Sequence, residues 1–190
     1  MVDTRRRGAS LLEAIHAAVL EELADNGYAG LSIERVADRA RTGKASIYRR
    51  WPTRMELVLD ALDSALPGPE QIVQGDDVRS DLLALLRRIA AVMSSRSGAA
   101  ARACLGPGVD PELSDAIRTR LVAPRRTALL ALLQEAAQRG EVRPEAVTER
   151  VAELGPTLLH GELLHRGHVD DAAVIAIVDE VLMPLLRAPR

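Results

Sequence analysis

The sequence predicts an all-α protein, and three features lead to that prediction. Hydrophobic residues make up 47% of the 190 residues, which is enough to form a substantial core. Alanine, leucine, glutamate and arginine, which are strong helix formers, dominate the chain. Phenylalanine is absent and aromatic residues make up only 2% of the chain, so the runs typical of β-strands are scarce. We expect about nine helices, three of them in an N-terminal domain.

The N-terminal part contains three helical patterns after a basic segment, residues 1–9, which we expect to form a flexible arm. Apolar residues three or four apart run from Leu12 to Leu23, and Asn26-Gly27 is a typical helix end. Ser32 caps a second, short helix. A third helix is predicted from about Lys44 to Arg50, because the proline at position 52 disfavours the α region for the residue before it.

The second and third helices are joined by only three residues, Arg41-Thr42-Gly43. Two short helices joined in this way form a helix-turn-helix when their inner faces pack together. Seven basic residues and one acidic residue lie between Arg35 and Arg54, although the whole chain has a net charge of −2. Because clustered positive charge is typical of surfaces that bind phosphates, we expect residues 10–52 to bind double-stranded DNA.

The outer face of the third helix carries the side chains that we expect to contact DNA. Small and polar side chains at its start suit base edges in the major groove, and those at its end suit phosphates. Ser32 and Thr53 begin helices, whose first backbone amides also suit phosphates. The expected DNA-contacting residues are Ser32, Arg41, Thr42, Lys44, Ala45, Ser46, Tyr48, Arg49, Arg50, Thr53 and Arg54.

The rest of the chain follows a connecting helix at 53–66, which Pro67-Gly68-Pro69 interrupts. We expect residues 67–190 to form a second helical domain. Its predicted helices cover 79–95, 99–105, 111–139 with a bend at Pro124, 144–166, and a last segment that begins at Asp170-Asp171.

Residues 10–62 resemble the TetR family of regulators. The resemblance rests on Asn26-Gly27-Tyr28, Leu31-Ser32-Ile33, Val36-Ala37, Ala40 and Lys44-Ala45-Ser46-Ile47-Tyr48-Arg49-Arg50-Trp51-Pro52. It implies a homodimer on a partly palindromic operator, usually a repressor, that a small molecule releases. It also implies that Lys44, Ala45 and Ser46 contact bases, and that Tyr48, Arg49, Arg50 and Arg54 hold the DNA backbone. The chain departs from the family at Arg41, where glycine is usual, and at Thr42, where a buried aliphatic residue is usual.

In the second domain, the resemblance implies ligand binding and dimerisation. The last two helices carry apolar side chains that we expect at the dimer interface: Val151, Leu154, Leu158, Ile175, Val178 and Leu182. Met93, Cys104 and His160 are candidate effector-binding residues. Because the region is almost free of aromatic residues, we expect an apolar effector.

Other functions are less favoured by the sequence. A DNA-binding protein without an effector is the main alternative, and an all-α enzyme is a weaker one because no convergent set of ionisable residues is visible. Glu13/His16, Glu162/His165 and the histidines at 160, 165 and 168 are possible metal ligands, but we expect no metal and no cofactor. With one cysteine and no apolar run long enough for a bilayer, we expect a cytoplasmic protein without a membrane span.

Overall fold

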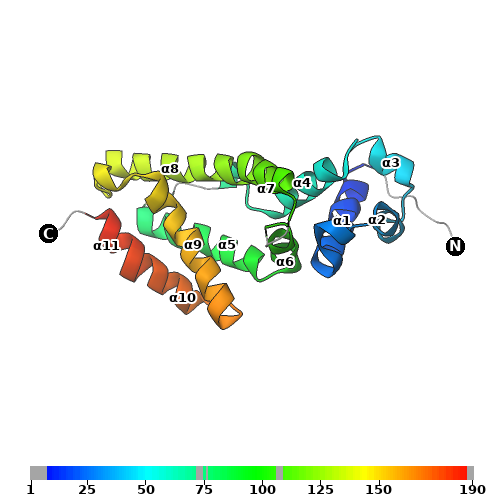
Figure 1. Cartoon of the computed structure of the whole chain (residues 1–190). Coiled ribbons are helices and arrows are strands. Elements are labelled where there is room, and N and C mark those ends of the chain that lie inside the picture. Colours follow the sequence, from blue (N-terminus) through cyan, green and yellow to red (C-terminus); the bar gives the residue numbers. More distant parts are fainter. Residues whose placement is uncertain (1–7, 72–74, 76, 106–108, 188–190) are drawn as a thin grey trace. The chain divides into compact units, whose positions relative to one another are not determined.

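The computed structural model describes residues 8–71, 75, 77–105 and 109–187, and these residues form helices and no strand (Figure 1). The predicted all-α class is confirmed. When each of two long helices with an internal π-helical segment is counted once, the described residues hold nine helices. Residues 1–7, which make up most of the expected arm, lie outside the described part of the chain.

The chain divides into two compact units. Unit 1 comprises residues 1–65 and 96–118, and unit 2 comprises residues 66–95 and 119–190. The helices of unit 1 are α1 (Ala9–Gly30), α2 (Ile33–Ala40), α3 (Lys44–Tyr48), α4 (Arg54–Ala65), α6 (Arg96–Ala103) and α7 (Pro111–Ile117). Helix α1 continues to Gly30 beyond the end expected at Asn26-Gly27. It is broken there, because Gly27 has φ 66°, a conformation that glycine adopts without steric cost.

Helices α6 and α7 belong to unit 1, whereas the sequence places the start of the second domain at residue 67. Helix α6 packs against α1. It can approach closely because its buried positions, Gly98 and Ala100, are small. Cys104 and Leu113 nearby in the chain are fully buried. Unit 1 therefore includes residues 96–118, which the sequence predicted to belong to the second domain.

Unit 2 contains α5, α8, α9, α10 and α11. Their bounds are α5 (Val78–Met93), α8 (Ala123–Gln138), α9 (Glu149–Arg166), α10 (Asp171–Ala176) and α11 (Met183–Leu186). A π-helical segment, Arg118–Val122, makes α7 and α8 one continuous helix, and a second one, Ile177–Leu182, joins α10 to α11. Helix α9 begins at Glu149 with Thr148 as its cap, and the expected start at Pro144 is instead a short 3₁₀ turn.

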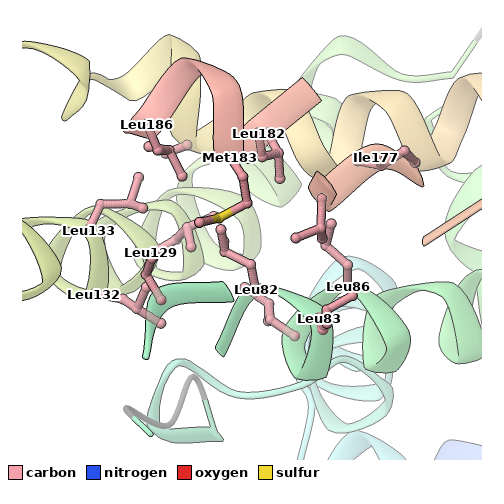
Figure 2. Close-up of a cluster of buried hydrophobic side chains, with 14 of the residues drawn as sticks. Leu82, Leu83, Leu86, Leu129, Leu132, Leu133, Ile177, Leu182, Met183 and Leu186 are labelled. Carbon is pink, nitrogen blue, oxygen red and sulfur yellow. The ribbon is translucent and has the colours of Figure 1, made fainter. Parts of the chain in front are cut away.

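The core of unit 2 is built almost entirely from aliphatic side chains. Figure 2 shows leucines of α5 and α8 facing the end of the last helix. The labelled residues are Leu82, Leu83, Leu86, Leu129, Leu132, Leu133, Ile177, Leu182, Met183 and Leu186. Burying one such side chain contributes roughly 1.5–3 kcal/mol, so this cluster is the main source of the unit's stability.

Two ion pairs connect α5 to the last helix of unit 2. Arg79 Nε donates to Asp179 Oδ1 and Arg87 Nε donates to Asp171 Oδ1, both at 2.6 Å. Each arginine donates a second hydrogen bond to the other oxygen of the same carboxylate. These bidentate contacts lower the pKa of Asp171 and of Asp179 below the ordinary value.

Among the described helices, none has both the length and the apolar composition needed to cross a bilayer.

Candidate nucleic-acid interface

The inner faces of α2 and α3 pack together as the sequence predicts. Val36 and Ala37 of α2 and Ile47 of α3 are buried, and the two helices are in contact. Trp51, three residues after the end of α3, is also buried. Since the inner faces are occupied, the remaining side chains of α3 face outward, which is the arrangement of a helix-turn-helix.

Local hydrogen bonds define both ends of α2. Ser32 Oγ accepts from the Arg35 amide at 3.4 Å, so the predicted cap is confirmed. At the other end Arg41 has φ 53°, in the left-handed region. The amide of Thr42 donates to the Ala37 carbonyl at 2.9 Å and the amide of Arg41 donates to the Asp38 carbonyl at 3.1 Å. This pattern is a Schellman motif with an arginine where glycine is usual.

The outer face of α3 presents the side chains that were expected to contact DNA. Lys44, Ala45 and Tyr48 are exposed, and Ser46 is half-buried. The helix ends at Tyr48, so the expected end at Arg50 is two residues too late. Arg49 and Arg50 lie in the turn that follows the helix, and both are exposed. The predicted surface is therefore formed partly by a helix and partly by the turn after it.

A capping box begins α4. Thr53 Oγ1 accepts from the Glu56 amide at 3.1 Å, and Glu56 Oε2 accepts from the Thr53 amide at 3.2 Å. The guanidinium of Arg54 stacks on the Tyr28 ring, 4.3 Å from its centroid. Arg54 is consequently held in place by α1 and is less exposed than the arginines after α3.

A partly buried hydrogen-bond network, in which the Asp60 side chain is half exposed, places α4 against α1 and the end of the helix-turn-helix. Asp60 Oδ2 accepts from Trp51 Nε1 at 2.9 Å and lies 3.0 Å from His16 Nε2. The ring centroids of His16 and Trp51 are 5.8 Å apart. Because one carboxylate joins residues of α1, α4 and the segment after α3, it fixes the orientation of these elements.

The positive charge of this region is smaller in the structure than the sequence indicates. Arg35 Nε donates to the buried Glu22 at 2.6 Å, and Arg39 donates to Glu21 at 2.8 Å and to Asp25 at 3.3 Å. These two arginines thus hold α2 against α1. Within the described residues, no carboxylate lies at ion-pair distance from Arg41, Arg49 or Arg50, which are exposed.

Lys44, at the start of α3, also has a partner. Its Nζ donates to Glu34 Oε1 at 2.7 Å, and Ser32 Oγ donates to Glu34 Oε2 at 3.2 Å. The hydrogen bond from Lys44 is the main cause that lowers the pKa of Glu34 to about 2, so this carboxylate is ionised at neutral pH. Glu34 was not predicted from the sequence, because the basic cluster was defined only from residue 35 onward. Its position two residues after the cap of α2 was the available signal.

The three candidate effector residues do not come together in one unit. Met93, at the end of α5, packs beside the core of unit 2, and His160 is exposed on α9. Cys104 belongs to unit 1, where burial raises the pKa of its thiol to about 11. The core of unit 2 has a cavity of about 10 Å³, roughly one water molecule, and none of the three candidates lines it. Aliphatic residues of α5, α8 and α9, such as Leu86, Leu129 and Val151, form much of its wall.

The six candidate interface residues fall into two groups. Val178 and Leu182 are buried in the chain's own core, with 0% and 3% exposure, so a partner subunit cannot contact them directly. This corrects the prediction for those two residues, because helical spacing does not distinguish a core face from an interface face. Val151, Leu154, Leu158 and Ile175 are half-buried at the edge of the same core. Leu164 on α9, which the sequence analysis did not single out, is 80% exposed.

Two of the histidines considered as metal ligands, His16 and His168, have other neighbours. His16 contacts Asp60 in unit 1, and the His168 ring nitrogen Nδ1 lies 3.1 Å from the Arg166 carbonyl oxygen. In the described part of the chain, no three histidine, cysteine, aspartate or glutamate side chains gather as metal ligands would.

Comparison with known proteins agrees with this geometry. Residues 15–61 match the family model described as bacterial regulatory proteins, tetR family, and residues 72–181 match the tetracyclin repressor-like C-terminal domain. A DNA-binding transcriptional repressor TetR of Mycobacteroides abscessus is 32% identical over 95% of this chain and 96% of its own. The crystal structure of the TetR family transcription regulator SCO0332 is 32% identical, with a TM-score of 0.65 over 91% of this chain and 97% of its own.

A second solved structure shares the fold. The transcriptional regulator FadR from Bacillus subtilis in complex with stearoyl-CoA has a TM-score of 0.70, 16% identity, and coverage of 92% of this chain and 97% of its own. The two family models, the relatives of about one third identity and the exposed helix-turn-helix lead to one conclusion. The chain belongs to the TetR family of bacterial DNA-binding transcriptional regulators.

Proposed function

We propose that this regulator is a homodimeric repressor that binds operator DNA through α3 and leaves it when a small apolar molecule binds. The observation that carries the proposal is the outer face of α3, where Arg41, Arg49 and Arg50 are exposed beside a helix whose inner face is packed. Repression is supported by the relative from Mycobacteroides abscessus, which is named as a repressor.

Two kinds of contact follow from the position of each side chain. Lys44, Ala45 and Ser46 form the first turn of α3 and are proposed to contact base edges. Phosphate contacts are proposed for the side chains around them, which orient the protein without distinguishing sequences. These are Ser32, Arg41, Thr42, Tyr48, Arg49, Arg50, Thr53 and Arg54.

We place the dimer interface on the exposed side of α9 and of the last helix. Four of the predicted residues, including Leu154 and Leu158, remain candidates because they are only half-buried. The exposed Leu164 extends this surface, since a large apolar side chain with 80% exposure gains from burial against a partner. In an isologous dimer the two recognition helices have to lie about 34–36 Å apart to reach successive major grooves.

The effector is proposed to enter unit 2, whose core is aliphatic and already contains a small cavity beside Gly155 and Pro156. A cavity of about 10 Å³ is far smaller than the ~300–1,000 Å³ of ligand pockets, so binding requires the helices to separate. Met93 remains a candidate contact at the edge of this core. His160, which is exposed, and Cys104, which is in unit 1, have weaker support. The solved FadR complex shows that a chain of this fold can hold an acyl compound.

Release requires that the effector bind more tightly to a conformation that does not fit the operator. The chain passes between the units after Ala65, at the end of the connecting helix α4, and again after Ser95 and Arg118. The third passage lies at the π-helical segment, a type of distortion frequent at functional sites. Coupling between two sites is typically about 1–3 kcal/mol, which corresponds to roughly 5–150-fold weaker operator binding.

A regulator without an effector is the second candidate, and the packed core of unit 2 favours it. Both candidates are DNA-binding proteins and neither is an enzyme. Because a bacterial operator lies in the cytoplasm, we propose that the protein acts there.

Selection of bound duplexes from a random-sequence pool tests DNA recognition. The purified chain is expected to enrich a partly palindromic sequence. Arg50→Ala should then weaken binding to all duplexes similarly and reduce the slope of log affinity against log salt by about 1. Ser46→Ala should instead change the enriched sequence. Equal effects of the two variants on affinity and on sequence would contradict the assigned roles.

A screen for compounds that release the selected operator separates the two candidates. If an apolar compound releases the wild type and also shifts its melting temperature, the effector proposal is supported. Failure of every compound class, acyl compounds included, would favour the regulator without an effector. In parallel, Leu164→Asp should convert dimers to folded monomers in sedimentation analysis, and an unchanged dimer would move the interface elsewhere.

A further inference from the structure

Glu34 stands at the start of α2 and contacts the residue that begins the recognition helix. Its Oε1 accepts from Lys44 Nζ at 2.7 Å, and its Oε2 accepts from Ser32 Oγ at 3.2 Å. The Glu34 and Lys44 side chains are 64% and 52% exposed, respectively. A hydrogen-bond acceptor and a donor are therefore presented side by side, from two helices, next to Ala45.

This ion pair contributes little to the stability of the fold. Exposed pairs are screened by water and salt, and holding two long side chains in place costs entropy. The contact between α2 and α3 is already made by the buried Val36 and Ile47. An acidic side chain on a phosphate-binding surface also weakens binding to every duplex, because it repels phosphates. Glu34 therefore weakens DNA binding unless its carboxylate accepts a hydrogen bond from a donor on the DNA.

The edges of bases in the major groove offer such a partner. A G·C pair presents the N7 and O6 acceptors of guanine directly beside the N4 amino donor of cytosine. Lysine recognises the first two, and glutamate accepts from the third. We infer that Lys44 and Glu34 together recognise one G·C base pair, with Lys44 donating to guanine and Glu34 accepting from cytosine N4. The inference rests on the proposed function, because it requires that α3 lie in the major groove.

The same pair of side chains fits other base pairs less well. At an A·T pair, Glu34 can accept from adenine N6, but the two acceptors, adenine N7 and thymine O4, lie on opposite sides of that donor, so Lys44 loses the adjacent pair of acceptors that guanine presents. Glu34 cannot approach a purely accepting edge or a phosphate without repulsion, which is how an unfavourable contact increases specificity. Ser32 assists by donating to the second carboxylate oxygen and so restricts its orientation.

The test compares base preferences of three proteins in the same duplex selection: the wild type, Glu34→Gln and Asp38→Asn. Asp38 is the matched control, because it is an exposed carboxylate on the same helix, four residues further along. We expect the wild type to require G·C at one position in each half-site. Glu34→Gln should reduce that preference by roughly 10-fold or more, since glutamine also suits adenine, while other positions are unchanged. Asp38→Asn should keep the wild-type preference.

Lys44→Met provides a second measurement. It should reduce the preference for G·C at the same position. The double variant Glu34→Gln/Lys44→Met should lose little further discrimination, because the two residues act on one base pair. Melting curves followed by circular dichroism check that all variants fold.

The outcomes separate this inference from the proposed function. If the wild type enriches no sequence, the proposed function itself fails. If the wild type enriches an operator and Glu34→Gln binds all duplexes more tightly with the same base preference, Glu34 only repels phosphates and the inference is overturned. A change at the same position in Asp38→Asn overturns it as well.

Discussion

A helix in each unit ends with the same backbone motif, but the residue at its left-handed position differs. At the end of α2, Arg41 has φ 53°, and Thr42 donates to the Ala37 carbonyl at 2.9 Å. At the end of α8, Gly140 has φ 78°, and Glu141 donates to the Ala136 carbonyl at 2.9 Å. The geometry is equivalent, yet one position holds a charged side chain and the other holds none.

The difference shows what each region requires from its sequence. Glycine adopts the left-handed conformation without steric cost, whereas a residue with a side chain pays about 1–2 kcal/mol. In unit 2 the left-handed position holds glycine, which adds no steric strain. In the helix-turn-helix an exposed arginine is kept in a strained conformation on the surface proposed to meet phosphates, and such strain is typical of functional sites.

The largest effects are expected when an aspartate is introduced into each region. Val178→Asp buries an unpaired carboxylate in the core of unit 2 and should abolish folding, because the cost is comparable with the ~5–15 kcal/mol that stabilise a domain. Ala45→Asp, on the exposed face of α3, should leave the melting temperature nearly unchanged but abolish DNA binding by repelling phosphates. Thermal melts and duplex binding measure the two effects. A folded, monomeric Val178→Asp protein would return Val178 to the dimer interface.

Removing a helix cap in each region should have a smaller effect on stability. Ser32 caps α2 and Thr148 caps α9, where its hydroxyl accepts from the Val151 amide at 3.2 Å. Replacing either by alanine should cost about 1 kcal/mol in urea unfolding. Only Ser32→Ala should also alter operator affinity, because Ser32 orients Glu34 and lies beside α3. Equal losses of affinity in both variants would mean that the cap of unit 2 affects DNA binding as strongly as that of the helix-turn-helix.

The two left-handed positions provide the most direct comparison. Arg41→Gly relieves about 1–2 kcal/mol of backbone strain. Glycine loses more conformational entropy on folding, which costs about 0.5–1 kcal/mol. The free energy of unfolding is therefore expected to rise by roughly 0.5–1 kcal/mol. Gly140→Ala should destabilise by about 1 kcal/mol, since no atom crowds the added methyl group and only the backbone is strained. Arg41→Gly should at the same time weaken DNA binding and lower its salt dependence. If Arg41→Gly strengthens binding, Arg41 does not contact phosphate.

The smallest effect concerns pH and the ion pairs of unit 2. Arg79 and Arg87 lower the pKa values of Asp179 and Asp171, so their stabilisation is present above the ordinary aspartate pKa and is lost as pH falls through the lowered values. The pKa shift of Asp81 has the opposite sign, because burial raises it. The contribution of Asp81 to stability is therefore lost as pH rises through the raised pKa. Asp179→Asn should therefore narrow the difference in urea midpoint between pH 7 and pH 3. Asp81→Asn should widen it, and the reverse order would contradict these assignments.

The elements of the helix-turn-helix were predictable because their signals are local. Ser32 and Pro52 are each recognised within a few residues, and the buried Ile47 follows from helical spacing. The features of this region that were not predictable depend on contacts between distant residues. The partners of Arg35 and Arg39 are carboxylates of α1, so a charge count along the chain overestimates the free positive charge. Glu34 is ten residues from Lys44 and meets it only when α2 and α3 pack.

In unit 2 the same approach predicted the helices but not the role of each face. Val178 and Leu158 both belong to apolar stripes with helical spacing, yet Val178 lies in the core and Leu158 lies at its edge. The proline at position 124 was expected to bend its helix, but the π-helical segment Arg118–Val122, which precedes this proline, was not predicted. The membership of α6 in unit 1 had no signal in its sequence.

The order of residues was enough to predict an all-helical protein with a helix-turn-helix, because caps, turns and apolar spacing act over one or two helical turns. Which charges remain free, which leucines are exposed and which helices share a core depend on contacts between residues far apart in the chain. Those contacts form only when the helices pack, and for this reason Glu34, Val178 and α6 acquired their places from the folded structure.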